Sequence, residues 1–214
     1  RILVLDLGGQ VLREYPTQEA ALRISVGSGA DPAVLAVSSG VLVRHAPAGT
    51  TTLLAAPDGV TFQNLREVGS QVWVASTAGI LRCDSSSGAA STPLTAAGGM
   101  LPDDDVRALD ADNGRVVAGC ATGISILDAD ATAAKLVLPG KGGLPAASVR
   151  AVAVRGDSVL VAHDRGASLL DPEVSVVSHF VSERYLPADG VLAVALGTDG
   201  TPWFATAKGV SHVR

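Results

Sequence analysis

The chain has 214 residues, of which 16 are Lys or Arg and 21 are Asp or Glu, so its formal net charge is −5. The basic residues are scattered singly, and without a basic stripe to neutralise phosphates we expect no nucleic-acid partner. Hydrophobic residues make up 47% and charged residues 17%, which excludes a disordered chain and predicts a folded core. No apolar run approaches the roughly 18 to 20 residues that cross a bilayer, so we expect no membrane span.

The first predicted elements are two strands, residues 2–6 and 11–15, joined by the turn Leu7-Gly8-Gly9-Gln10. The sequence begins at Arg1 rather than Met, which indicates a processed or partial product in which a signal peptide or anchor would not be visible. The sequence leaves open whether all 214 residues belong to a larger chain or assembly.

Five segments that follow share one pattern, a strand, a glycine turn and a second strand. The glycines are spaced by 39, 44, 43 and 43 residues; they are Gly40, Gly79, Gly123, Gly166 and Gly209. These equivalent positions form one column of the repeat. A second column has the same period, because a Leu-Pro pair begins five residues before a valine in three units. These are Leu101-Pro102 before Val106, Leu144-Pro145 before Val149, and Leu186-Pro187 before Val191. Two columns with one period predict a repeat protein.

The third unit shows the predicted strands most clearly. Residues 106–111 and 115–120 form a hairpin around Asp112-Asn113-Gly114, a turn whose residues tolerate positive φ. Residues 124–128 and 135–138 supply two further strands before Pro139-Gly140 closes the unit. Four short antiparallel strands repeated every 43 residues or so are typical of a β-propeller.

Two columns in the second strands predict how neighbouring sheets pack. The large apolar position is occupied by Val34, Trp73, Val117, Leu160 and Trp203. The small position, two residues later, is occupied by Ala36, Ala75, Gly119, Ala162 and Ala205. Side chains two residues apart in a strand share a face, so both columns should meet the next sheet and interdigitate with it. The glycine column is predicted to mark a turn with positive φ.

We therefore predict one all-β domain over residues 1–214, a propeller of five four-stranded blades. The blades are predicted at about 20–60, 61–99, 100–142, 143–185 and 186–214, the last completed by 1–16. The strand count is 21, whereas a closed ring of five blades needs 20. Either residues 11–15 close the last blade with 2–6 outside it, or the chain is part of a larger ring. We favour the first, because a blade sealed by both termini protects its edges.

The segments LPDDDVRALDADNGRVVAGCATGISILD and LPAASVRAVAVRGDSVLVAHDRGASLLD resemble the propeller repeat of bacterial two-component regulators. That repeat runs Leu-Pro, a polar turn, Val-x-x-Leu, a turn with Asp and Gly, Leu-Trp-x-Gly-Thr, and a Gly with an apolar pair. The match is good in units three to five, moderate in the second and weak in the first. The resemblance implies an extracytoplasmic binding or sensing module, periplasmic or secreted, and carries no catalytic residue across.

Candidate binding residues lie on the predicted loops and first strands. Asp103, Asp104 and Asp105 enter a first strand, where they form either a cation site or, as we favour, a solvated turn. Arg165 and Lys208 follow second strands, where they either meet the acidic loop on one rim as a mixed-charge binding surface or, as we favour, are ordinary polar loop tips. Arg107 and Arg150 begin first strands, where each could offer its guanidinium to a carboxylate or phosphate in the axial channel. The favoured alternative is a salt bridge or a solvated channel lining.

No nucleophile with a base, and no carboxylate pair at a fixed separation, can be assembled, so we expect no catalytic residue, no metal and no cofactor. The four histidines are predicted on different strands and blades; they are His45, His163, His179 and His212. Cys83 and Cys120 lack metal-site spacing and are predicted as separate buried thiols, with an inter-blade disulfide as the alternative.

The favoured function is a non-catalytic binding, sensing or scaffold propeller whose loop rims contact a protein partner or a small ligand. The alternative is an enzyme, a hydrolase or lyase, with a small site at the propeller axis.

Overall fold

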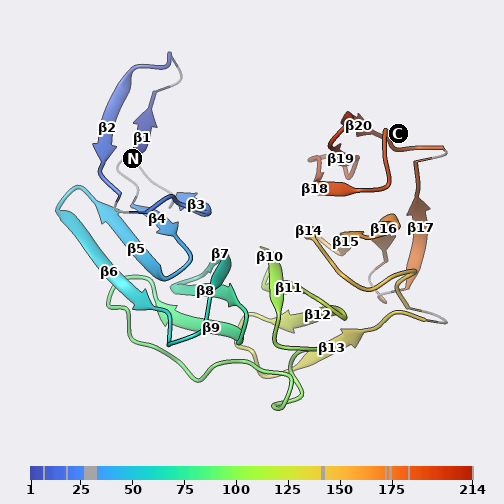
Figure 1. Cartoon of the computed structure of the whole chain (residues 1–214), viewed down its shortest axis with the longest axis horizontal. Helices are drawn as coiled ribbons and strands as arrows, with labels where there is room; N and C mark the ends of the chain where they lie inside the picture. The colour runs from blue at the N-terminus through green and yellow to red at the C-terminus, as the bar shows by residue number, and fades with distance from the viewer. Residues whose placement is uncertain are drawn as a thin grey trace.

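The computed structural model describes residues 1–6, 8–17, 19–26, 33–140, 143–171, 173, 175–182 and 184–213. Two residues of the predicted terminal elements, Leu7 and Arg214, lie outside the described residues. Every regular element is a β-strand, and the described sheets are antiparallel. In Figure 1 the sheets stand side by side around an axis as an open arc, with the two termini on either side of its opening. The structure confirms the all-β class.

Three sheets have four strands in sequence order, as the repeat predicted. Their strands are β3 (Arg23–Val26), β4 (Val34–Val37), β5 (Val41–Ala46) and β6 (Gly49–Ala55); β10 (Val106–Asp112), β11 (Arg115–Cys120), β12 (Gly123–Asp128) and β13 (Ala134–Val137); β14 (Ala151–Arg155), β15 (Ser158–His163), β16 (Gly166–Leu170) and β17 (Val176–Phe180). The predicted turn between β10 and β11 is confirmed, since φ is 49° at Asn113 and 76° at Gly114. Such angles give the twist that a two-strand hairpin needs.

Two sheets have three strands, β7 (Phe62–Val68), β8 (Gln71–Ser76) and β9 (Gly79–Asp84), and β18 (Val191–Leu196), β19 (Pro202–Thr206) and β20 (Gly209–His212). Beside β9 the predicted fourth strand is reduced to two isolated bridges, Ile80 to Leu94 and Cys83 to Ala90. The intervening stretch is rich in Ser, Gly and Pro, which are poor strand formers. The four-strand prediction is therefore wrong for this unit.

Side chains of the second strands form the core between successive sheets. Trp73, Val117 and Leu160 are fully buried, each in a cluster with residues of the following sheet. The small position is equally crowded, because a Cβ added at Gly119 would lie 2.6 Å from a methyl carbon of Val149. The large and small columns thus pack face to face with the next sheet, as predicted.

In the first full sheet the predicted columns are displaced by one residue. Leu35 and Val37, not Val34 and Ala36, pack with the following sheet. The cause is that Gly40 is not the equivalent of Gly79. Gly79 has a positive φ and Gly40 does not, and the residue that pairs in the first hairpin as Gly79 pairs in the next is Val41. Alignment on Gly40 therefore shifted the strand by one residue, and such a shift turns every side chain to the other face.

The remaining strands, β1 (Ile2–Leu5) and β2 (Val11–Tyr15), pair with each other and form a sheet of their own. Ile2 and Tyr15 pack on Val34 and Ala36, and the Tyr15 ring stacks on His45 with 4.9 Å between ring centres. These contacts hold the hairpin against β3–β6. The predicted closure of the last blade by the N-terminal strands is accordingly not found: β18–β20 is a separate sheet in the described chain.

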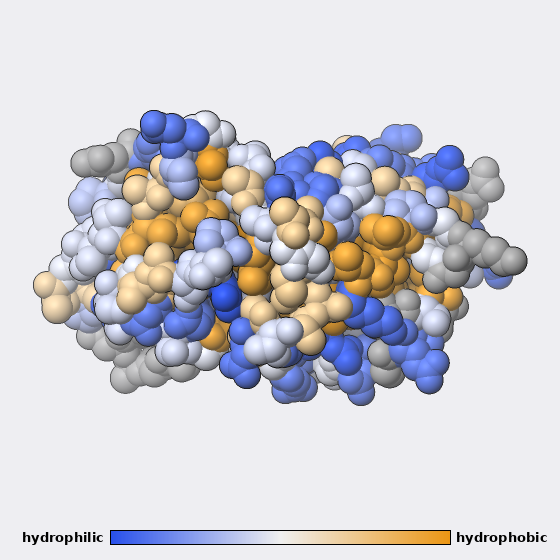
Figure 2. All heavy atoms as spheres, turned by 90° about the horizontal axis from the view of Figure 1, so that it is seen from below, coloured by the Kyte–Doolittle hydropathy of each residue, from blue (hydrophilic) through white to orange (hydrophobic). Residues whose placement is uncertain are grey.

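The outer side of the arc is shown in Figure 2, where apolar side chains gather in patches bounded by polar ones. The described chain holds no helix with the length and apolar character needed to cross a membrane.

Candidate functional site

The first strands of the five larger sheets meet at the axis of the arc. One cavity of about 150 Å³ there is lined by residues of β3, β7, β10, β14 and β18 together. Its polar lining includes Arg23, Asn64, Arg66 and Arg150, and apolar side chains make up much of the rest; among these are Ile24, Val152 and Leu192. We call this cavity the axial mouth.

Three arginines of the axial mouth differ in their partners. Arg66 donates from Nε to Oδ1 of Asp110 at 2.8 Å. Arg150 donates from Nε and Nη2 to Oδ1 of Asp164 at 3.3 and 3.1 Å, and both side chains are about half exposed. Arg23 donates from Nη1 to the carbonyl oxygen of Leu22 and has no carboxylate partner in the described chain. Guanidinium groups thus exceed their carboxylate partners at the mouth.

A second axial cavity, of about 320 Å³, lies beside Arg66, Asp110, Asp112 and Arg155. Here two carboxylates join neighbouring sheets: Asp110 Oδ2 accepts from the backbone N–H of Val154 at 2.8 Å, and Asp112 Oδ2 accepts from that of Gly156 at 2.6 Å. The Val154 N–H lies on the inner edge of β14 and the Gly156 N–H in the turn that follows, and in both places the sheet supplies no partner. The two aspartates therefore stabilise the arrangement of sheets.

The acidic triplet forms a hydrogen-bonded frame at the rim. Asp103 accepts from the Thr122 N–H and hydroxyl, Asp104 from the Ala96 N–H, and Asp105 from Gln63 and Arg107. Partial burial would raise the pKa of Asp105, but the hydrogen bonds from Arg107 and Gln63 hold it below its ordinary value. Among the described residues no group of three or more His, Cys, Asp or Glu side chains is placed to hold a metal.

The other predicted residues are placed in different ways. Arg107 pairs with Asp105 at 2.7 Å and reaches the Ser148 hydroxyl at 3.0 Å, whereas Arg150 lines the axial mouth. Arg165 and Lys208 lie exposed on turns that their backbone N–H groups stabilise, by donating to His163 and Thr206. The structure therefore brings Arg107 to Asp105 and Arg150 to Asp164, and it gives Arg165 and Lys208 no side-chain partner within the described chain.

Sequence reasoning missed Arg23, Arg66 and Asp110. A signal for the last two was present, because Arg66 lies opposite Trp73 and Asp110 lies opposite Val117, which are equivalent members of the large column. Opposite charges at one repeat position of adjacent blades would have indicated an ion pair between their neighbouring first strands.

A polar cluster lies inside the β14–β17 sheet. His163 Nε2 is 2.9 Å from the Ser168 hydroxyl, which lies 3.3 Å from His179 Nδ1, and the two rings stack at 5.3 Å. The prediction that the histidines occupy different blades is wrong for this pair. Burial, with a further contribution from His179, lowers the pKa of His163 to about 4. Ser168 and His163 are fully buried, so a substrate has no access to them.

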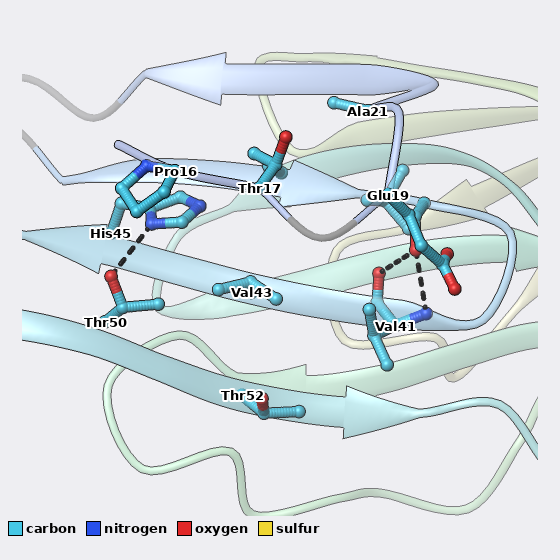
Figure 3. A pocket seen from close by; sticks show the side chains of 12 residues that line it. Pro16, Thr17, Glu19, Ala21, Val41, Val43, His45, Thr50 and Thr52 are labelled. Carbon is cyan, nitrogen blue, oxygen red and sulfur yellow. Dashed lines mark hydrogen bonds between the residues drawn. The ribbon is translucent and has the colours of Figure 1, made fainter. Parts of the chain in front are cut away.

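A third cavity, of about 290 Å³, lies over β4–β6 beneath the connection that follows β2. Figure 3 shows His45 and Thr50 at one end of it and Glu19 at the other, with Val43 and Thr52 between. His45 Nδ1 is 3.0 Å from the Thr50 hydroxyl, and burial lowers the pKa of His45. None of the residues predicted for binding lines this cavity.

No protein-family model and no curated protein matches the chain. Solved structures do: the extracellular domain of the hybrid two-component system BT3049 of B. thetaiotaomicron is similar with a TM-score of 0.73 and 16% identity, over 95% of this chain and 29% of that one. PorZ, a surface component of the type-IX secretion system of Porphyromonas gingivalis, is similar with a TM-score of 0.69 and 18% identity, over 95% and 34%.

The WD40 β-propeller domain of Doa1 is similar with a TM-score of 0.69 and 14% identity, over 92% of this chain and 64% of that one. At these identities the likeness establishes the fold, so the resemblance to sensor propellers of two-component regulators is confirmed at that level. The chain spans about a third of the length of the BT3049 and PorZ structures.

Proposed function

We propose that this chain is a non-catalytic binding propeller that takes a small ligand at the axial mouth. The observation that carries the proposal is the convergence of five first strands on one cavity whose arginines exceed their carboxylate partners. Concave sites with apolar walls and a few convergent polar groups are the usual form of small-molecule sites. Arg107, Arg165 and Lys208 do not line the axial mouth, and we assign them to contact with a protein partner on the loop rim rather than with the small ligand.

The alternative, an enzyme acting at the axis, is less well supported. The Asp105 carboxylate already accepts hydrogen bonds from Arg107 and Gln63, which lower its pKa and oppose a role as general acid. Asp103 and Asp104 are engaged in hydrogen bonds from Thr122 and Ala96. The buried Ser168 has histidines at hydrogen-bonding distance but no exposed surface through which a substrate could reach it. Binding therefore accounts for the polar groups better than catalysis does.

We extend the proposal to a sensing role outside the cytoplasm, supported by the extracellular domain among the similar structures. In this role the propeller would bind its ligand and pass the change to a protein partner. Binding at the mouth needs only the five inner strands β3, β7, β10, β14 and β18. The proposal is therefore the same for a complete ring of five blades and for part of a larger ring.

A substitution that fills the axial mouth with a bulky side chain tests this function. Leu192 lines the axial mouth and Leu138 does not, and both are about half exposed. Thermal unfolding would be followed with acetate, succinate, citrate, phosphate, choline and glucose as probes, for the wild type, Leu192→Trp and the control Leu138→Trp. We expect at least one probe to raise the Tm of the wild type and the control, and none to raise that of Leu192→Trp. Binding of the same probe by all three proteins would contradict the proposal.

A further inference from the structure

The axial mouth offers hydrogen-bond donors without matching acceptors. Arg66 uses Nε on Asp110, and its two terminal nitrogens make no hydrogen bond to a described residue. Arg23 uses one nitrogen on the carbonyl oxygen of Leu22, and Nη1 of Arg150 is likewise unused within the described chain. A guanidinium has five N–H donors and no acceptor, so a ligand at the mouth must supply acceptors, and a carboxylate supplies them together with the opposite charge.

Among the described residues, no carboxylate lines the mouth to neutralise these charges. Asp110, the partner of Arg66, borders the neighbouring axial cavity, and Asp164 reaches Arg150 from the turn after β15. The Arg150 to Asp164 pair is half exposed and its contacts are 3.1 to 3.3 Å long. An exposed pair of this kind contributes little to stability, so a bound anion can compete for Arg150 at little cost.

The size and walls of the mouth narrow the class of anion. Its 150 Å³ is space for about five water molecules, at roughly 30 Å³ for each, which suits a small acid rather than a peptide or nucleotide. Ile24, Val152 and Leu192 supply apolar wall beside the arginines. A hydrocarbon stem gains from contact with such a wall, whereas inorganic phosphate has none to offer.

From these observations we infer that the axial mouth binds a small organic acid through its carboxylates, held by Arg23 and Arg150 with the terminal nitrogens of Arg66. This inference rests on the proposed function and adds the ligand class to it. Arg66 also stabilises the fold through Asp110, so the test uses the two arginines that lack such a role. Charge-assisted pairing of guanidinium with carboxylate supplies both the affinity and the preference for an anion.

Isothermal titration calorimetry with succinate tests the inference, using the wild type, Arg23→Gln, Arg150→Gln and the control Arg165→Gln. The control removes the same charge from an exposed rim turn outside the mouth. We expect each mouth variant to weaken succinate binding about tenfold or more, and the control to change it less than about twofold. Circular dichroism would verify that all variants keep the wild-type fold.

The other probes separate the possible failures. Phosphate bound as tightly as succinate would overturn the organic-acid class, because apolar contact would then add nothing. Choline or glucose bound at the mouth while succinate is not would overturn the inference and leave the proposed function standing. Equal weakening by Arg165→Gln would assign binding to the general charge of the rim and overturn the role of the mouth arginines. Failure of every probe to bind would contradict both proposals.

Discussion

The Asp110 carboxylate accepts a hydrogen bond from Nε of Arg66 at 2.8 Å and another from the backbone N–H of Val154 at 2.8 Å, so one side chain joins three adjacent sheets. It is mostly shielded from solvent, with 16% of the side chain exposed. A largely buried carboxylate with two such partners contributes more to stability than an exposed ion pair does.

Replacement of Asp110 by Ala is therefore expected to lower the free energy of unfolding by about 2 kcal/mol, since it leaves the Val154 N–H and Arg66 without their acceptor. Asp157→Ala is the control, because Asp157 also pairs with an arginine of the adjacent sheet, at 3.3 Å, but is 72% exposed. Urea denaturation should show a loss below about 0.5 kcal/mol for the control. Equal losses would contradict the role assigned to Asp110.

Acid should destabilise the protein through His163. Its folded-state pKa is lowered to about 4 by burial and by His179, while Asp164 opposes the shift and Arg165 adds to it. In the unfolded chain the pKa returns to about 6.5, so the unfolded state binds the proton first. The stabilisation is complete above pH 6.5 and is lost as the pH falls towards 4, by up to roughly 3 kcal/mol.

Denaturation measured from pH 4 to 7.5 should show this slope in the wild type and in His212→Gln, whose residue is exposed. In His163→Gln the slope should be reduced. An unchanged slope in His163→Gln would mean that other groups cause the acid sensitivity.

The two thiols should be unreactive in the native protein. Cys83 and Cys120 are both free and fully buried, which confirms the prediction of separate thiols. Burial raises the pKa of Cys120 to about 12, with a smaller contribution from Asp103, and the thiolate is the reactive form. Ellman's reagent should detect almost no thiol before unfolding and two per chain in denaturant. Rapid reaction of the native protein would contradict this burial.

The open arc predicts unequal tryptophans. Trp73 is fully buried beneath the next sheet, whereas Trp203, at the equivalent position of the last sheet, is 43% exposed. Acrylamide should quench one component of the fluorescence strongly and the other weakly, and Trp203→Phe should remove the quenched component. Protection of both tryptophans would show that the Trp203 side of β18–β20 is covered in solution.

Much of the fold was predictable because the repeat records how sheets pack. Trp73, Val117 and Leu160 recur because each blade needs a large apolar side chain to fill the space against the next sheet. Gly79 is required because a Cβ there would lie 2.2 Å from the carbonyl oxygen of Leu94. The first blade was misaligned because Gly40 resembles that glycine in sequence but not in conformation. Closure could not be predicted, since it depends on whether Tyr15 packs on the first sheet or the last, and one residue carries no information on that choice.

The candidate site was only partly predictable for a related reason. Arg150 was identified from its place at the start of a first strand. Arg23 lies in the first unit, where the repeat is weak, and Arg66 could be recognised only by comparison with Asp110 at the same repeat position. Their convergence arises from the arc of sheets, which brings strands far apart in sequence to one cavity. The acidic triplet was conspicuous in sequence, yet its hydrogen bonds form a structural frame.

Arginine side-chain NMR during a succinate titration tests the central claim most directly, because each Nε–H signal reports on its own guanidinium. The signals of Arg23, Arg66 and Arg150 should shift together and saturate at one concentration, while those of Arg82 and Arg115, which lie outside the axial mouth, stay in place. Shifts spread evenly over all five arginines, or none at Arg23 and Arg150, would contradict a binding site at the axis.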